Sequence, residues 1–308
     1  MSSVTLTTAE QARLHRAKPS FIGLVGGEIF KSTRMLSTWL TFALMLCFVA
    51  APNIILLLIQ VPFAENFKLG NNPKALDAFY NLLETDFLML RVFIGFFLIF
   101  LTANVIGREY QLGTIRILLA RGVGRLQLLL AKVSAVVLIG LITFLIWLLV
   151  LSGLMLLTPL VKSGNLNALQ ALNGDFWHNV ELYLLTIFIS MGATMLLTVA
   201  ICAVGRSLAL GLTVSALFFP IDNIAMAMMR IVFLITKNDF WKNITAYFLG
   251  PNLNQMASVA ITTHNIENAG APTLVDVDFN HTMLVTLVYA VIFVVVAIAL
   301  TWRRDVKE

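Results

Sequence analysis

The stretch Gly107–Lys132, GREYQLGTIRILLARGVGRLQLLLAK, is the longest polar and basic interruption between two long apolar runs of this chain. Its only acid is Glu109, and its five cations are Arg108, Arg116, Arg121, Arg125 and Lys132. In chains that cross a membrane, short loops rich in Lys and Arg stay on the cytoplasmic side. This loop is therefore expected to fix the orientation of the helices on both sides of it.

The composition indicates a membrane protein. Hydrophobic residues make up 59% of the 308 residues and charged residues only 12%, which is too little polar surface to cover a soluble globule of this size. No polar segment between the apolar runs is long enough to fold alone, so we expect one membrane domain, residues 1–308. The net charge of +5 then reflects positive-inside topology and contact with membrane lipids, and no nucleic-acid partner is expected.

Six apolar runs predict six transmembrane helices and an all-α fold. Each run is long enough to cross about 30 Å of hydrocarbon at about 1.5 Å per residue. The runs lie at about 36–61, 87–107, 133–161, 182–205, 207–236 and 281–302. The turn Gly205–Ser207 is so short that the fourth and fifth spans must be antiparallel neighbours. Pro220 inside the fifth span predicts a bend or a break there.

The distribution of cations predicts that both chain ends are cytoplasmic. In the six-span scheme, 14 of the 21 Lys and Arg residues lie on the inner side and five on the outer side. Residues 1–35 form a cytoplasmic tail and, after Pro19, a short amphipathic helix on the membrane surface. The outer segment 237–280 has an apolar middle, which predicts short or re-entrant helices before the last span.

The chain carries no pattern that predicts catalysis or metal binding by itself. Gly26–Thr33 superficially resembles a phosphate-binding loop, but Phe30 stands where a glycine must precede Lys31, and no strand leads into it. No nucleophile or metalloprotease motif is present. The outer histidines do not have the spacing of metal ligands, and neither do the two cysteines. We therefore expect no enzymatic activity, no metal and no cofactor in this chain.

Two ionisable residues in apolar spans, Arg91 and Asp222, suggest an intramembrane ion pair. Charges in hydrocarbon are costly and usually paired. Measured from the cytoplasmic ends of their spans, both residues lie roughly 22 to 24 Å up. The alternative is that Arg91 reaches the outer headgroups while Asp222 caps the helix that restarts after Pro220.

Within the basic loop, a short amphipathic helix is predicted at the inner surface. Ile115, Leu118 and Leu119 have the i, i+3, i+4 spacing of one helical face, while Arg116 points away. The Gly122–Gly124 turn then lets the third span begin. Such a helix does no chemistry, but it offers a rigid handle on the second and third spans that another protein can push.

These residues resemble the signature of type-2 ABC exporter permeases of the ABCG-like class. The signature E-x-x-x-G-T…L-L…R…K is matched here by Glu109, Gly113-Thr114, Leu118-Leu119, Arg125 and Lys132. The resemblance covers the whole chain, including the amphipathic first helix, six spans and the outer segment before the last span. It departs at Gly122 and Gly124, where the family commonly has Pro and Ser, and this puts the geometry of the turn in question.

The resemblance implies a permease in a prokaryotic inner (cytoplasmic) membrane. It would pair with a second permease copy, as a homodimer or a heterodimer, and rest on two copies of a separate ABC ATPase subunit that binds ATP and Mg. The loop 107–125 would then be the coupling helix seated on that ATPase. The residues implied in coupling are Glu109, Tyr110, Gly113, Thr114, Arg116, Leu118, Arg121 and Arg125.

The same resemblance implies a substrate path between the two copies, lined mainly by the second and fifth spans. Candidate path residues are Phe93, Phe96, Phe97, Phe100, Phe218 and Phe219. The alternative is that these aromatic side chains face lipid or pack helices together. A path of this composition suits amphipathic cargo such as a peptide, an antibiotic, a drug or a lipid.

Two other functions remain open at this stage. One is an ATPase-coupled scaffold that transmits force to an outer partner without moving a solute. The other is a secondary transporter, which would need several buried acids or paired broken helices for ion coupling. The sequence predicts one such acid and one broken span, which favours the ATP-driven exporter.

Overall fold

The computed structural model describes residues 20–58, 73–120, 122–163, 166–268 and 270–303, and over these residues the fold is helical with no strand. Six helices in these ranges are long and apolar enough to cross a membrane, which confirms the predicted all-α, six-span fold. They are α3 (Leu36–Leu58), α4 (Pro73–Thr102) with its continuation to Gln111, α7 (Arg125–Ser163), α8 (Gly174–Gly205), α9 (Leu208–Thr236) and α12 (Phe279–Arg303).

Several of these helices are longer than the apolar runs that predicted them. The second span was expected to begin near residue 87, but α4 already begins at Pro73, and α7 begins at Arg125 rather than near residue 133. Hydropathy marks only the part of a helix that suits hydrocarbon. Helix growth is cooperative, so a helix continues past that part until a turn or a cap ends it.

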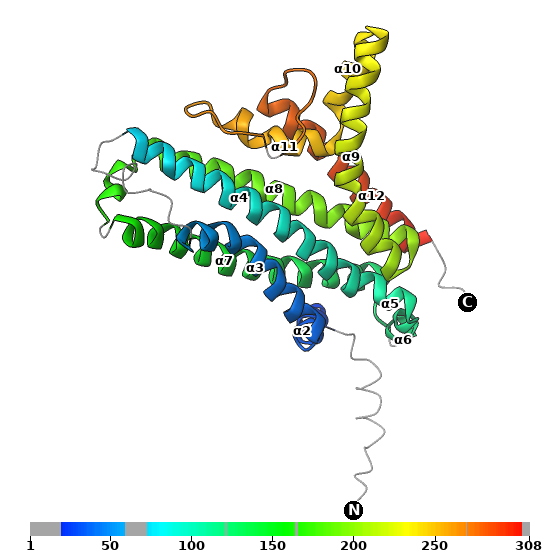
Figure 1. The fold of residues 1–308 in the computed structure, drawn as a ribbon. Helices are drawn as coiled ribbons and strands as arrows, with labels where there is room; N and C mark the ends of the chain where they lie inside the picture. The colour runs from blue at the N-terminus through cyan, green and yellow to red at the C-terminus, as the bar shows by residue number, and fades with distance from the viewer. Residues whose placement is uncertain (1–19, 59–72, 121, 164–165, 269, 304–308) are drawn as a thin grey trace, which may run out of the picture.

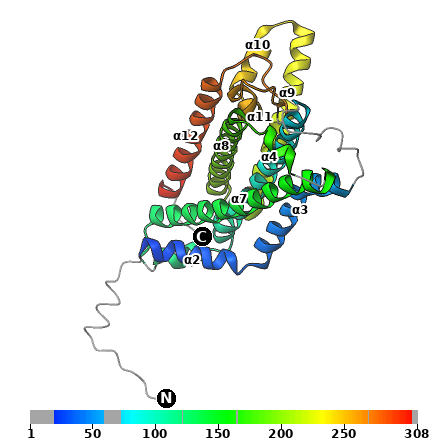
Figure 2. The ribbon, with the colours of Figure 1, turned by 90° about the vertical axis from the view of Figure 1, so that its left-hand side faces the viewer.

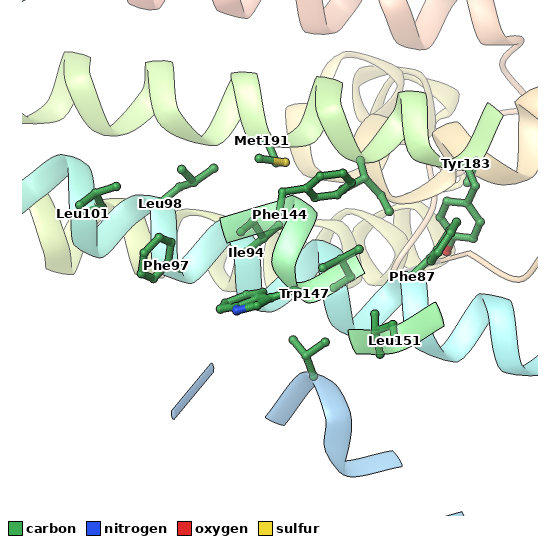
Figure 3. Packing of buried hydrophobic residues seen from close by; sticks show 14 of the residues in the cluster. Phe87, Ile94, Phe97, Leu98, Leu101, Phe144, Trp147, Leu151, Tyr183 and Met191 are labelled. Atoms are coloured by element: carbon green, nitrogen blue, oxygen red, sulfur yellow. The ribbon is translucent and has the colours of Figure 1, made fainter. Parts of the chain in front are cut away.

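Helices α4 and α8 form the centre of the bundle. They are the most buried of the six long helices, with α3 and α7 packed against α4 and α12 packed against α8. Figure 3 shows Ile94 and Phe97 of α4, Phe144 and Trp147 of α7, and Met191 of α8 in one cluster. The rings of Phe97 and Trp147 lie 5.8 Å apart, centroid to centroid. Large side chains from three helices thus hold these helices in fixed relative positions.

The short helices lie on two opposite sides of the bundle (Figure 1). At one end lie α2 (Phe21–Thr33), α5 (Arg108–Gln111), α6 (Thr114–Ala120) and the last turn of α12. Figure 2 shows α2 lying along α7 at this end. On the opposite side, α10 (Asp239–Asn243) and the 3₁₀ turn η4 (Ile244–Tyr247) follow the far end of α9, and α11 (Leu249–Ala260) lies against the middle of α8. The basic loop and the segment before α12 are therefore on opposite sides of the bundle.

The tight turn between α8 and α9 holds these helices side by side, as the sequence predicts. Arg206 is in the left-handed region with φ 47°, and its N–H donates to the carbonyl of Cys202 at 2.9 Å. The turn lies against Gly107, where a Cβ atom would be only 3.0 Å from the Cα of Leu208. A side chain at residue 107 would push against the backbone of this turn, so α9 begins in direct contact with the start of the basic loop.

Helix α9 corrects one expectation. It runs without interruption from Leu208 to Thr236, so of the two outcomes predicted at Pro220 the break is wrong, while a bend there stays a prediction. A proline removes one backbone hydrogen bond, and a long helix tolerates this loss where neighbouring groups satisfy the backbone. Figure 1 shows that α9 rises away from α4 and α8, and it is the least buried of the six long helices.

In the segment 237–280, α11 is the main structured part. Every residue from Leu249 to Ala257 is buried, and α11 packs against α8, α9 and α12. The short helices expected before the last span are present in this fold. How deeply α11 enters a membrane stays a prediction, because it depends on the bilayer and not on the packing alone.

Candidate functional site

Four charged side chains join three helices beside the basic loop. Lys132 of α7 places its Nζ 2.6 Å from Oε1 of Glu28 in α2 and 2.6 Å from Oε2 of Glu109 in α5. Lys31 of α2 also pairs with Glu109, and its Nζ lies 3.7 Å from Oε2 of Glu28. We call Glu28, Lys31, Glu109 and Lys132 the ionic cluster. The ionic cluster links α2 to Glu109 near the start of the basic loop and to Lys132 at its end.

The ionic cluster is balanced in charge and almost fully buried. Lys132 is 2% exposed, Glu109 5% and Glu28 7%, while the side chain of Lys31 reaches the surface. Burying a charge is costly unless a partner compensates it, and breaking a buried pair is strongly destabilising. Because two acids face two lysines, each buried charge has a partner. The cluster therefore acts as a rigid connection between α2, α5 and α7.

The second span reaches the cluster through a π-helical segment. Between α4 and α5, residues Ala103–Gly107 form the π-helix η2, in which all five residues are buried. The carbonyl of Val105 in this segment accepts a hydrogen bond of 3.1 Å from Lys132. Single π-helical turns are rare and often occur at functional sites. Lys132 therefore binds both the wide turn and the acid that follows it.

The predicted amphipathic helix of the loop is α6. Its apolar face, with Ile115 buried, packs against Leu24 of α2 and Leu128 of α7. Gly113 has φ 69° and Gly122 has φ 84°, so the backbone is left-handed just before and just after α6. Proline fixes φ near −65° and cannot adopt this conformation. Gly122 is therefore required by the turn in this chain.

The remaining predicted coupling residues are placed around α6. Tyr110 is half-buried and packs into both the bundle core and the α6 contacts, and Thr114 begins α6. A guanidinium nitrogen of Arg125 donates to the carbonyl of Trp302 at 3.2 Å, which ties the start of α7 to the end of α12. Leu118 is half-buried in the α6 contacts. Arg121 and the side chain of Arg116 lie outside the described residues.

Residues 23–306 match the family described as "ABC-2 family transporter protein". The chain belongs to the ABC-2 transporter family. The uncharacterized protein YhcI of Bacillus subtilis (strain 168) is similar to it, with 25% identity over 231 residues, which cover 73% of this chain and 68% of that protein. No solved structure matches. The family match covers all six long helices and the basic loop.

This membership shows what kind of subunit the chain is. ABC-2 permeases are multi-pass membrane subunits that associate with an ABC ATPase, and they are generally not catalytic themselves. The ionic cluster of this ABC-2 permease includes Glu109 of α5, and the neighbouring Tyr110 packs with α6, so the cluster lies next to the loop for which the resemblance implies ATPase contact.

The six candidate path residues of the ABC-2 permease lie in different surroundings. Phe97 is buried in the core, and Phe93 stacks on Phe48 of α3 with ring centroids 5.1 Å apart. Phe100 is half-buried, and Phe218 packs beside Phe219 against α11. Phe96 and Phe219 come together on the wall of one cavity. Helix packing accounts for Phe93 and Phe97, while the assignment of a path stays a prediction.

Arg91 and Asp222 do not form an ion pair among the described residues. Arg91 donates to Ser190 Oγ of α8 at 2.9 Å and to Asn254 Oδ1 of α11 at 3.2 Å. Asp222 accepts from the backbone N–H of Gly250 at 2.5 Å and so caps the first turn of α11. Equal height along two helices does not fix their lateral distance. In this fold, α11 supplies partners to both residues and removes the need for direct pairing.

The sequence reasoning missed three members of the ionic cluster and one buried acid. Lys132 was used as a topology signal and as part of the permease signature, but no partner was predicted for it. Nor was pairing predicted for Glu28 and Lys31, although their i, i+3 spacing was a usable sign of it. Asp86 stands just before the second predicted span, which was expected to begin near residue 87. Because α4 begins at Pro73, Asp86 is inside the helix, buried and hydrogen-bonded to the side chain of Asn53.

Proposed function

We propose that this ABC-2 permease exports amphipathic molecules, such as peptides, antibiotics, drugs or lipids, across the cytoplasmic membrane of a prokaryote. Two permease copies form the path and rest on two copies of a separate ABC ATPase, which binds ATP and Mg. The basic loop and both chain ends face the cytoplasm. The loop 107–125 docks on the ATPase, and ATP-driven closure of the two ATPases moves it.

One observation carries this proposal: the largely buried ionic cluster connects the loop, through Glu109 of α5, to the helices α2 and α7. A push on α6 reaches Glu109 through the short helix α5. From Glu109 it passes to α7 through Lys132 and to α2 through Lys31. Breaking a buried pair costs about 3 to 5 kcal/mol, so these helices move together more readily than they separate.

The exposure of α9 supports a second permease copy. In the single chain, α9 is apolar and the least buried of the long helices, with exposed side chains such as Ile221, Ile224 and Ile231. In a membrane such a surface contacts either lipid or another helix. A second copy packed near α9 would bring Phe96 and Phe219 of each protomer toward a shared path.

The test uses the permease purified with its ABC ATPase and reconstituted in proteoliposomes. Glu109→Gln keeps the shape of the side chain but removes its charge, and Glu181→Gln on the exposed start of α8 is the matched control. We expect Glu109→Gln to assemble while transport of an amphipathic dye falls roughly tenfold, as expected if about 1.4 kcal/mol of coupling is lost. Glu181→Gln should match the wild type. Normal transport by Glu109→Gln would contradict the coupling role, and ATP hydrolysis without dye movement in the wild type would contradict export.

A further inference from the structure

A cavity of about 150 Å³ lies between α4, α8, α9 and α11. It is distinct from the ionic cluster, because Arg91 and Glu109 are separated by about 27 Å along the helix at about 1.5 Å per residue. Its polar wall holds Arg91, Ser190, Asn223 and Asn254, and its apolar wall includes Phe96 and Phe219. The cavity thus brings a cation, neutral polar groups and aromatic rings into one space.

The charge of Arg91 has no compensating acid in direct contact. Its two hydrogen bonds go to the neutral oxygens of Ser190 and Asn254, and among the described residues it forms no salt bridge. Asn254 is held in turn by Asn223, whose Oδ1 accepts from it at 3.1 Å. An arginine within a membrane helix is costly, and such residues usually mark a functional site. A guanidinium in this position can still accept an anionic ligand.

The cavity is open to the surface of the single chain. Val92 and Phe96 belong to its wall, and they are 39% and 37% exposed. At about 30 Å³ per water, its volume corresponds to roughly five water molecules. This is enough for a carboxylate or phosphate group and the first methylene groups of a chain. A longer apolar tail would leave the cavity along Phe96 and Phe219.

We infer that this cavity binds the anionic head group, a carboxylate or a phosphate, of an amphipathic molecule, with Arg91 supplying the charge and Phe96 and Phe219 contacting the tail. The inference rests on the proposed function in one respect, because it identifies this molecule with the cargo. It narrows the cargo from amphipathic molecules in general to those with a negative head group. Arg91 forms charge-assisted hydrogen bonds with such a group, which are stronger than those to its neutral partners.

Ser190 offers a matched pair of variants. Its Oγ lies 2.9 Å from Nε of Arg91, so Ser190→Asp places a carboxylate beside the guanidinium and occupies the charge from within the chain. Asparagine has nearly the same size and shape as aspartate but carries no charge, so Ser190→Asn is the control for Ser190→Asp. If Arg91 only holds α4, α8 and α11 together, ligand binding should not distinguish these two variants. If Arg91 binds an anion, they should differ.

The experiment measures binding of radiolabelled dodecyl phosphate to the full-length permease in phosphatidylcholine nanodiscs, corrected for empty nanodiscs. We expect saturable binding by the wild type and by Ser190→Asn. For Ser190→Asp and Arg91→Gln we expect binding weaker by about tenfold or more, since tenfold corresponds to about 1.4 kcal/mol. Dodecyltrimethylammonium should not compete. Similar thermal unfolding of Ser190→Asp and Ser190→Asn will show that the charge causes the loss.

Three results would overturn the inference. The first is no saturable binding by the wild type, and the second is equal binding by the two Ser190 variants. The third is complete displacement of dodecyl phosphate by phosphatidylglycerol in the nanodisc, which would indicate a resident lipid instead of cargo.

The export proposal is tested separately by ATP hydrolysis in the assembled complex. If dodecyl phosphate binds but does not stimulate hydrolysis, the site stands and its assignment to export fails. If other amphiphiles stimulate hydrolysis while dodecyl phosphate does not bind, export stands and this inference fails.

Discussion

The Nζ atom of Lys132 lies 2.6 Å from Oε2 of Glu109, although one residue is in α7 and the other is in the short helix α5 on the far side of α6. The pair therefore closes the whole basic loop at its base. The same Nζ atom contacts Glu28 of α2 at 2.6 Å. A movement of the loop must displace three helices together or separate buried charges.

Replacing Lys132 by Met should destabilise the permease strongly. The variant leaves Glu28 and Glu109 buried with only the half-exposed Lys31 between them, and breaking a buried pair typically costs about 3 to 5 kcal/mol. Lys31→Met is the control, and it should cost less, about 1 kcal/mol, because the side chain of Lys31 is 40% exposed and water partly screens its charge. Thermal unfolding of the purified permease in one detergent measures both variants. Equal unfolding temperatures for the two would show that burial of Lys132 is not important.

Removing one acid together with Lys132 should restore part of this stability. In the double variant Glu109→Leu, Lys132→Met, the remaining Glu28 and Lys31 still balance each other. Contacting residues show interaction energies of about 0.5 to 3 kcal/mol in double-mutant cycles, and we expect this one near the upper end. The double variant should unfold at a higher temperature than Lys132→Met alone. It should nevertheless fail to couple ATP hydrolysis to transport, because the connection from loop to α7 is gone. Strict additivity of the two single changes would contradict the pairing.

Gly122→Ala should weaken the turn after α6 for a purely conformational reason. A Cβ atom at this position would meet nothing within 4 Å, but φ is 84°. The left-handed conformation costs a non-glycine residue about 1 to 2 kcal/mol. Gly124→Ala is the matched control: its φ is not positive, and its Cβ would make an ordinary contact at 3.6 Å with Gln127. Unfolding temperature and ATPase binding should fall for Gly122→Ala alone. Equal loss in both variants would show that the turn itself is not limiting.

The parts of the fold that could be predicted from sequence depend on local pattern. The long apolar runs, which contain few charges, predicted six long helices because the cost of burying a charge in hydrocarbon acts at every residue. The spacing of Ile115, Leu118 and Leu119 predicted α6, since the residues of one helical face recur every three or four positions. Gly122 indicated a turn because glycine adopts backbone conformations that other residues avoid, which is also a local property.

The parts that could not be predicted depend on contacts between distant residues. Nothing in the sequence places Glu28 beside Lys132, because their contact requires α2 to lie along α7. The height argument for Arg91 and Asp222 gave similar depths but could not include α11, which supplies both with partners. Of the bend or break predicted at Pro220, the break does not occur, because α9 tolerates one missing hydrogen bond within a long helix.

Replacing Asp222 by Ala should loosen the segment between α9 and α12 without affecting the ionic cluster. Asp222 accepts from the N–H of Gly250 and thus caps the buried helix α11. Loss of a cap typically costs about 0.5 to 2 kcal/mol, and the N–H of Gly250 would then be left without its acceptor. We expect hydrogen exchange in residues 249–260 to become faster by roughly tenfold, as about 1.4 kcal/mol of lost protection would give. Asp239→Ala, at an exposed position in α10, should leave this exchange unchanged. Unchanged exchange in Asp222→Ala would show that packing against α8 and α12, and not the cap, holds α11 in place.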